Sequence, residues 1–263
     1  PTLTPFTQAR RPWPLFVGGS YFRSDGEQNY NALSLQAQRR MGQVTFDTHW
    51  TLTSNYYTTD SRSLENPYAS PGFSRVPYTS RQRAVFNVVW EMPFGRGRKY
   101  MADAPAVVNG ILGGWRLYWI GYLESGFFFS PTFSGSDPSN TNTVGGVPDR
   151  VANGNLATDQ RQIDRWFDTA AFRVPQAGTF GNSAPNVLEG PGYNMQHISI
   201  AKAFDITERL KFTFTAALSN AFNHPNFTVP RANISSPGTV ATVADLREGA
   251  RARHVELRGR IDW

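Results

Sequence analysis

The chain has no cysteine and few charged residues for its length. The absence of cysteine from all 263 residues excludes a disulfide framework and a thiolate metal site. Charged side chains make up 17% of the sequence, below the roughly 25% that is usual in soluble domains. No apolar run reaches the length of about 18 residues that a transmembrane helix needs. The net charge of +6 comes from scattered arginines rather than a basic stripe, so nucleic acid is not an expected partner.

The sequence also lacks the motifs of catalytic and metal sites. Its 4 histidines are scattered, and none has the spacing of a metal-binding pair. Asp159, Asp164 and Asp168 are not spaced like the ligands of an EF-hand calcium loop. The Gly-Arg-Gly-Arg sequence at 95–98 is not followed by the Lys-Ser/Thr of a phosphate-binding loop. We therefore expect no enzymatic activity, no cofactor and no resident metal.

What the chain does contain is alternation, and the clearest example is at its end. Residues 253–263 alternate between apolar and polar side chains, and a period of two is that of a β-strand. The apolar set is Val255, Leu257, Gly259, Ile261 and Trp263. A terminal strand with one apolar face and a final aromatic resembles the signal that directs bacterial outer-membrane barrels to their assembly machinery. The alternative is an edge strand of a soluble β protein.

Similar alternation recurs along the chain. The predicted strands cover 15–23, 29–39, 44–52, 83–91, 114–124, 196–204, 210–222 and 253–263. Within the strand at 44–52, Val44, Phe46, Trp50 and Leu52 share one face, while Asp47 and His49 share the other. Strands of about ten residues match the roughly 9–11 that cross a membrane when tilted. We therefore expect the first set to face lipid and the second set to face the barrel lumen.

The connections between these strands alternate in length. Long irregular segments at 55–80, 126–193 and 223–251 are separated by shorter ones, with a short helix expected within 104–112 and a helical turn at 163–167. In an up-and-down meander, all three long segments lie at the same end of the sheet. The predicted fold is therefore all-β: a segment of an antiparallel transmembrane β-barrel, with about eight strands and long extracellular loops.

Short motifs along most of the chain resemble those of one receptor family. They lie at 29–33, 90–98, 112–115, 163–172, 190–192, 206–210 and 220–227. These motifs are similar to the C-terminal part of TonB-dependent receptors, specifically the Oar-like subgroup with an N-terminal carboxypeptidase-regulatory-like domain. The chain departs from the family pattern at Asp149 and Asp168, where Asn is expected, and at Trp263, where Phe is more usual.

The resemblance implies an outer-membrane barrel of about 22 strands with a plug inside, in a Gram-negative bacterium. Residues 1–263 would be the C-terminal part of that barrel, without the plug, the TonB box or the N-terminal domain. The implied function is uptake of a large substrate such as a siderophore or an oligosaccharide. The expected partners are outer-membrane lipid and lipopolysaccharide, the barrel-assembly machinery and TonB.

The predicted extracellular loops supply the candidates for ligand contact. These are Tyr56, Tyr57, Tyr68, Tyr78, Arg165 and Trp166. Aromatic rings and guanidinium groups suit sugars or ligands that carry carboxylates. The alternative is that Trp166 and Phe172 only pack the long loop onto itself. Two further functions stay open: a free-standing barrel with an adhesive or structural role, and a soluble carbohydrate-binding module.

Overall fold

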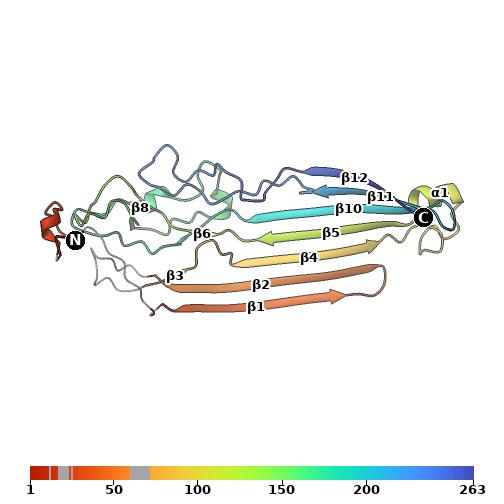
Figure 1. Cartoon of the computed structure of the whole chain (residues 1–263), viewed down its shortest axis with the longest axis horizontal. Helices are drawn as coiled ribbons and strands as arrows, with labels where there is room; N and C mark the ends of the chain where they lie inside the picture. Colours follow the sequence, from red (N-terminus) through yellow and green to blue (C-terminus); the bar gives the residue numbers. More distant parts are fainter. Residues whose placement is uncertain (12, 17–23, 25, 60–71) are drawn as a thin grey trace.

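The computed structural model describes the whole chain except residues 12, 17–23, 25 and 60–71. Its main feature is one antiparallel sheet with the strand order β1-β2-β4-β5-β10-β11-β12, with β3 also paired to β2 (Figure 1). The strands of this sheet are β1 (Gln28–Arg39), β2 (Val44–Thr59), β3 (Gly72–Arg75), β4 (Gln82–Glu91), β5 (Trp115–Glu124), β10 (Tyr193–Asp205), β11 (Lys211–Ser219) and β12 (His254–Asp262).

The remaining elements are short. Two small sheets pair β6 (Phe128–Phe129) with β9 (Leu188–Glu189) and β7 (Asp149–Arg150) with β8 (Phe172–Arg173). The helices are α1 (Ala106–Leu112), η1 (Gln8–Arg10), η2 (Thr158–Gln160) and η3 (Thr169–Ala171). None of the helices in the described part of the chain is long and apolar enough to cross a lipid bilayer.

Most of the predicted elements are confirmed. Seven of the predicted strands coincide with long strands of the sheet, and the expected helix is α1. The predicted strand at 15–23 lies largely outside the described residues. The expected helical turn at 163–167 is wrong, because Gln162 and Arg165 exchange backbone hydrogen bonds of 3.0 and 3.1 Å across a tight reverse turn.

Two strand boundaries differ from the prediction for clear physical reasons. Strand β2 continues to Thr59 because its Tyr- and Thr-rich end favours extended backbone and pairs with both β1 and β3. At about 3.3 Å per residue, its 16 residues span about 50 Å, more than the roughly 30 Å of a hydrocarbon core. Strand β11 ends before the predicted 222, because Asn220 adopts a left-handed backbone with φ 48°.

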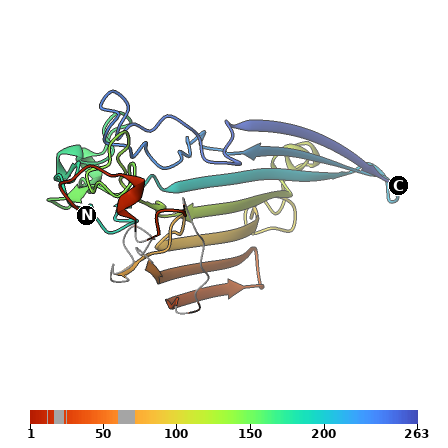
Figure 2. The ribbon, with the colours of Figure 1, turned by 60° about the vertical axis from the view of Figure 1, so that its left-hand side comes forward.

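The described parts of the long connections lie at one end of the sheet, as predicted. We call this the loop end; Figure 1 shows the 125–192 and 220–253 segments gathered there, with the N-terminus. The opposite end, the turn end, carries the 40–43 and 206–210 turns and the connection that contains α1. Figure 2 shows the same separation from a second direction.

The strand register gathers the alternating residues into two continuous faces. Cross-strand partners share a face, and the pairs Leu35 with Trp50, Phe46 with Val88, and Trp90 with Leu117 are all apolar. This apolar face continues to the far edge with Leu33, Val44, Leu52, Ala84, Phe86, Trp119, Leu123, Ile198, Ile200, Phe212, Phe214, Leu218, Val255, Leu257 and Ile261. The opposite, polar face carries Gln36, Asp47, His49, Thr51, Asn87, Ser199, Thr215, Glu256, Arg258 and Arg260.

Among the polar side chains on the apolar face, Gln196 and Lys202 are buried, and both have partners. Gln196 is 6% exposed, and its Oε1 accepts a 2.8 Å hydrogen bond from the indole N–H of Trp119. Lys202 is 3% exposed, and its Nζ donates to the carbonyl oxygens of Asn109, at 3.2 Å, and Gly113. The last carbonyls of α1 therefore satisfy this ammonium at the turn end.

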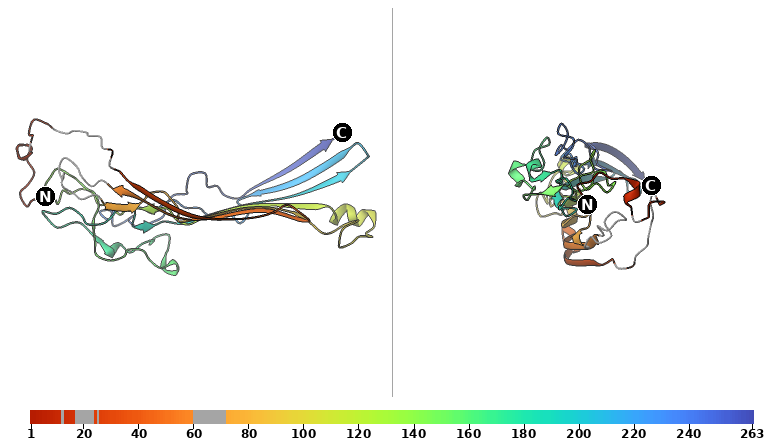
Figure 3. Two further views of the ribbon diagram at one scale, coloured as in Figure 1. Left: turned by 90° about the horizontal axis from the view of Figure 1, so that it is seen from below. Right: turned by 90° about the vertical axis from the view of Figure 1, so that its left-hand side faces the viewer.

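The sheet is open within the described residues. Strand β1 pairs only with β2, and β12 pairs only with β11. Figure 3 shows β10, β11 and β12 curving away from the plane of the first strands, in line with the natural twist of sheets. Both outer strands thus present unpaired backbone edges.

Candidate binding site at the loop end

The loop end holds the buried core of the molecule. We call the segments 125–192 and 220–253 together the loop cap. Phe167 is 1% exposed and Leu188 is 0% exposed, and both belong to a core cluster with Phe129, Phe172 and Ala171. Phe167 packs edge-on against Phe129 and Phe172, with ring centroids 6.0 Å away in each case. The long loops therefore fold onto one another rather than spreading into solvent.

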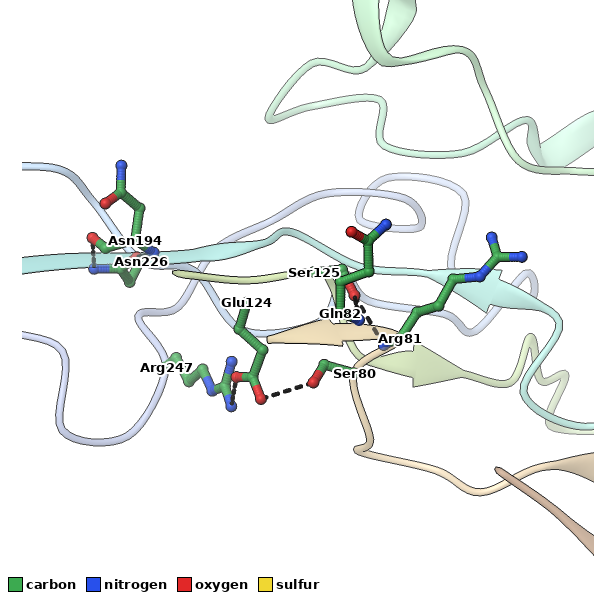
Figure 4. Close-up of polar contacts among 8 residues, drawn as sticks. All are labelled: Ser80, Arg81, Gln82, Glu124, Ser125, Asn194, Asn226 and Arg247. Carbon is green, nitrogen blue, oxygen red and sulfur yellow. Dashed lines mark hydrogen bonds and ion pairs between the residues drawn. The ribbon is translucent and has the colours of Figure 1, made fainter. Parts of the chain in front are cut away.

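An ion pair joins the loop cap to the sheet. The guanidinium of Arg247 lies 2.8 Å from Glu124 Oε2, and the side chain of Glu124 is 8% exposed. Glu124 also accepts a 2.8 Å hydrogen bond from the hydroxyl of Ser80 (Figure 4). Arg247 lies over the ring of Phe127, at 3.6 Å from its centroid. This partly buried pair connects the segment before β12 to the end of β5 and the start of β4.

Side chains also hold the strand ends where the long loops leave the sheet. The hydroxyl of Ser125 accepts hydrogen bonds from the backbone N–H groups of Arg81 and Gln82, at 2.8 and 3.0 Å. Asn226, 1% exposed, binds both backbone groups of Asn194: its Oδ1 accepts from the N–H at 2.6 Å, and its Nδ2 donates to the carbonyl at 3.0 Å (Figure 4). These contacts fix the loop cap in one position over the strands.

Strand β3 is attached to the loop cap through Asn186. The Nδ2 of Asn186 donates to the carbonyl of Arg75 at 2.7 Å, and its backbone N–H donates to Ser130 Oγ at 2.9 Å. The hydroxyl of Ser74 donates to the carbonyl of Pro185. Asn186 was missed at the sequence level. Its left-handed backbone, with φ 56°, favours Asn, but nothing in the sequence identifies its distant partners.

The predicted ligand residues Tyr56 and Tyr57 lie in a strand, not in a loop. They are neighbours in β2 and therefore point to opposite faces of the sheet. Tyr56 is on the apolar face, and the guanidinium of Arg75 lies over its ring, 5.0 Å from the ring centroid. Tyr57 is on the polar face, opposite Gln28. The two tyrosines therefore cannot contribute to one site.

The other predicted ligand residues are also separated. Tyr78 is 67% exposed and contacts Phe127 edge-on, while Tyr68 lies outside the described residues. Trp166 packs against the core of the loop cap and donates a 2.9 Å hydrogen bond to the carbonyl of Glu189. The cation over its ring is Arg161, 5.7 Å from the centroid, rather than Arg165. Trp166 and Phe172 thus pack the long loop onto itself, as the alternative prediction held.

Three of the predicted residues line different pockets at this end of the sheet. Trp166 lines a rim pocket of about 700 Å³ together with Arg83, Glu124 and His224. Tyr56 lines an edge pocket of about 680 Å³ together with Arg75 and Arg81. Tyr57 lines the cap pocket, of about 840 Å³, between β2, β3 and the loop cap.

Near the cap pocket, Asp137 organises a tight turn. Its carboxylate accepts hydrogen bonds from the hydroxyl of Ser139 at 2.7 Å and from the backbone N–H of Asn142 at 2.6 Å. Burial acts to raise the pKa of this carboxyl, but these hydrogen bonds outweigh it and hold the pKa below its ordinary value. Asp137 is therefore a structural anion of the loop cap.

The predicted assembly residues lie in β12 and just beyond it. Val255, Leu257, Gly259 and Ile261 lie on the apolar face, where they pair with residues of β11. Leu257 is 69% exposed, and Trp263, after the end of the strand, is 93% exposed. Within the described residues, no group of three or more His, Asp or Glu side chains is arranged to hold a metal ion.

Fold and loops together define a class of protein: the wall of a membrane-spanning β-barrel with a packed loop cap at one end. The chain belongs to the family described as outer membrane beta barrel domain, whose family model matches residues 1–256. The chain matches no curated protein and no solved structure. The family places the protein in the outer membrane of Gram-negative bacteria, so the hypothesis of a soluble module is wrong.

Proposed function

We propose that this chain forms part of the barrel wall and the extracellular loops of a TonB-dependent receptor. The observation that carries the proposal is the open sheet. Its apolar face spans seven long strands, yet β1 and β12 do not pair with each other. Backbone groups in lipid need partners, so both edges must be completed by further strands. A wide barrel of the transporter type meets this need better than a free-standing barrel closed by these strands alone.

In this arrangement the apolar face contacts outer-membrane lipid and lipopolysaccharide, and the polar face lines the lumen. The loop cap is the extracellular surface that meets the substrate, a siderophore or an oligosaccharide. Strand β12, with its exposed Leu257 and Ile261, is the segment offered to the barrel-assembly machinery. The protein carries its substrate without changing it.

Binding to TonB distinguishes a receptor from an adhesive or structural barrel. The full-length protein that contains this chain should be purified in detergent and passed over the immobilised periplasmic domain of TonB. We expect retention of the full-length protein. A control barrel of similar size without a TonB box should pass through. Equal behaviour of the two proteins would contradict the proposed receptor function.

The sidedness of the loops is tested separately. Epitopes inserted in 76–80, 126–190 and 226–250 of the full-length protein should all be stained on intact cells, because these segments lie at the same end of the sheet. An epitope in the 40–43 turn should be reached only after permeabilisation. One long loop that stains only after permeabilisation would contradict the topology.

A further inference from the structure

Among the described residues, the lining of the cap pocket has no charged side chain, unlike the linings of the rim pocket and the edge pocket. Nineteen described residues line it, and in a chain with 17% charged residues about three of them would be expected to carry a charge. The rim pocket and the edge pocket both include arginines. Asp137 precedes the lining residue Pro138, and its carboxylate already accepts hydrogen bonds from Ser139 and Asn142. A ligand charge buried in the cap pocket would therefore find no opposite charge among the described lining residues, which is costly.

The lining combines aromatic rings with small polar groups. Tyr57 and Phe180 contribute partly exposed rings, and Thr143 and Asn182 contribute exposed hydroxyl and amide groups. Phe133 and Ser139 also line the pocket, but they are only 5% and 2% exposed. The Oδ1 of Asn182 accepts the backbone N–H of Arg150 at 2.7 Å, whereas its NH2 group and the hydroxyl of Tyr57 make no hydrogen bond among the described residues. Rings that pack against C–H surfaces, together with unused donors, suit a ligand with apolar faces and hydroxyl edges.

The backbone of the pocket wall is not available to an added peptide strand. Phe133 and Gly146 already exchange both backbone hydrogen bonds, at 2.9 and 3.2 Å, and the N–H of Gly145 donates to Ser136 at 2.9 Å. A peptide that binds by strand addition needs a row of free backbone groups. A Cβ at Gly181 would collide with the carbonyl oxygen of Val147, so this wall is also closely packed. These features favour a sugar over a peptide.

We infer that the cap pocket binds an uncharged oligosaccharide. The inference rests on the proposed receptor function and specifies its substrate class, because it excludes a charged siderophore from this pocket. The pocket volume of about 840 Å³ lies in the upper part of the roughly 300–1,000 Å³ that ligand sites occupy. Tyr57 stands on the polar face, so a sugar held here is at the entrance to the lumen.

The test uses the full-length protein in detergent and isothermal titration. The probes are the neutral hexasaccharides of glucose, mannose, galactose and xylose, the anionic hexagalacturonate, and an acetylated and amidated hexaserine peptide. We expect at least one neutral saccharide to bind, and hexagalacturonate to bind at least tenfold more weakly. Absence of binding by every neutral saccharide, tighter binding of hexagalacturonate, or binding of the peptide alone would overturn the inference.

The matched variants are Tyr57→Ala and Tyr56→Ala, which remove the same side chain from neighbouring residues on opposite faces. Loss of one stacking ring weakens binding about tenfold, so Tyr57→Ala should lower the affinity by that factor and Tyr56→Ala should not. Tyr57→Phe keeps the ring for packing and should lose less than Tyr57→Ala. Equal losses in Tyr56→Ala and Tyr57→Ala would place the site elsewhere.

The two proposals fail in different ways. Neutral saccharide binding that depends on Tyr57, in a protein that does not bind TonB, would uphold the pocket and overturn the receptor function. Retention on TonB without binding of any neutral saccharide would uphold the receptor function and overturn the pocket assignment.

Discussion

The sheet and the loop cap use apolar residues in opposite ways. Leu188 in the loop cap is 0% exposed, whereas Leu257 in β12 is 69% exposed. Both are leucines in β-strands of the same chain. The core of the loop cap is complete within the chain, so it needs no outside partner. On the apolar face of the sheet, Leu33, Leu35 and Leu257 are each more than half exposed, and the outer membrane supplies the missing apolar environment.

This difference divides the molecule into a part that is stabilised by internal packing and a part that is stabilised by lipid. In the loop cap, aromatic rings meet edge-on, as in a soluble domain. In the sheet, stability comes from backbone pairing and from transfer of one face into hydrocarbon. A mutation should therefore have different consequences in the two regions even when the residue types are the same.

The largest expected effect comes from the same truncation made in both regions. Leu188→Ala leaves a cavity in the core of the loop cap and should destabilise it by about 2–5 kcal/mol. Leu257 faces lipid, which fills the space left by Leu257→Ala, so this variant should leave the loop cap unchanged. The measurement is native-state proteolysis of segment 126–190 in the full-length protein in outer-membrane vesicles. Equal protection in both variants would show that the loop cap has no core of its own.

The second effect compares the two faces of β2. An arginine at Phe46 would enter lipid and should cost about 2–4 kcal/mol of folding free energy near the middle of the bilayer. An arginine at Asp47 faces the lumen and should cost much less. Folding of Phe46→Arg and Asp47→Arg into lipid vesicles, followed by denaturant titration, measures both. If both variants fold equally well, the assignment of faces is wrong.

The third effect tests how the loop cap is attached. Glu124→Gln removes the charge that pairs with Arg247, and should weaken the attachment by about 1.5–3 kcal/mol. The same change at Glu256, whose partner Arg258 is 68% exposed, should change nothing measurable. The rate of hydrogen exchange in segment 226–247 measures how often this attachment opens. Faster exchange in Glu256→Gln than in Glu124→Gln would contradict the role of the pair between Glu124 and Arg247.

The smallest effect is a pH dependence confined to the loop cap. Because the pKa of Asp137 is lowered in the folded protein, its contribution to stability is present above the ordinary Asp pKa and is lost as pH falls through the lowered value. Asp137→Asn should remove this dependence. The measurement is proteolysis of segment 126–190 as a function of pH. Identical acid profiles for the wild type and the variant would rule out Asp137 as the cause.

Strand periodicity was enough to predict the sheet. In the strand from Val44 to Leu52, for example, the alternation of apolar and polar residues indicates the face on which each residue lies. The loop cap could not be predicted in the same way. Its core joins Phe129, Phe167 and Leu188, which are far apart in the sequence and follow no period. Only the packing of Trp166 and Phe172 was anticipated, as an alternative to ligand contact.

The candidate site shows the same limit. Tyr57 was selected for its residue type. It is separated from Tyr56 because β2 extends to Thr59 and places neighbouring residues on opposite faces. The polar composition of that stretch favoured a loop, so the extension of the strand was not predicted. The partners that complete the cap pocket, such as Phe133 and Asn182, come from a distant segment. Residue type alone therefore identified one wall of the pocket and missed the other.

The central claim is that alternate residues of the sheet face lipid and water. The most direct test is a scan of single cysteines through 44–52 in the full-length protein, with any other cysteine replaced, in lipid vesicles. Each cysteine carries a fluorophore that is exposed in turn to a lipid-soluble and a water-soluble quencher. The account predicts quenching by the lipid-soluble reagent at Phe46 and Trp50, and by the water-soluble reagent at Asp47 and His49. Uniform quenching along the strand, or alternation in the opposite phase, would contradict it.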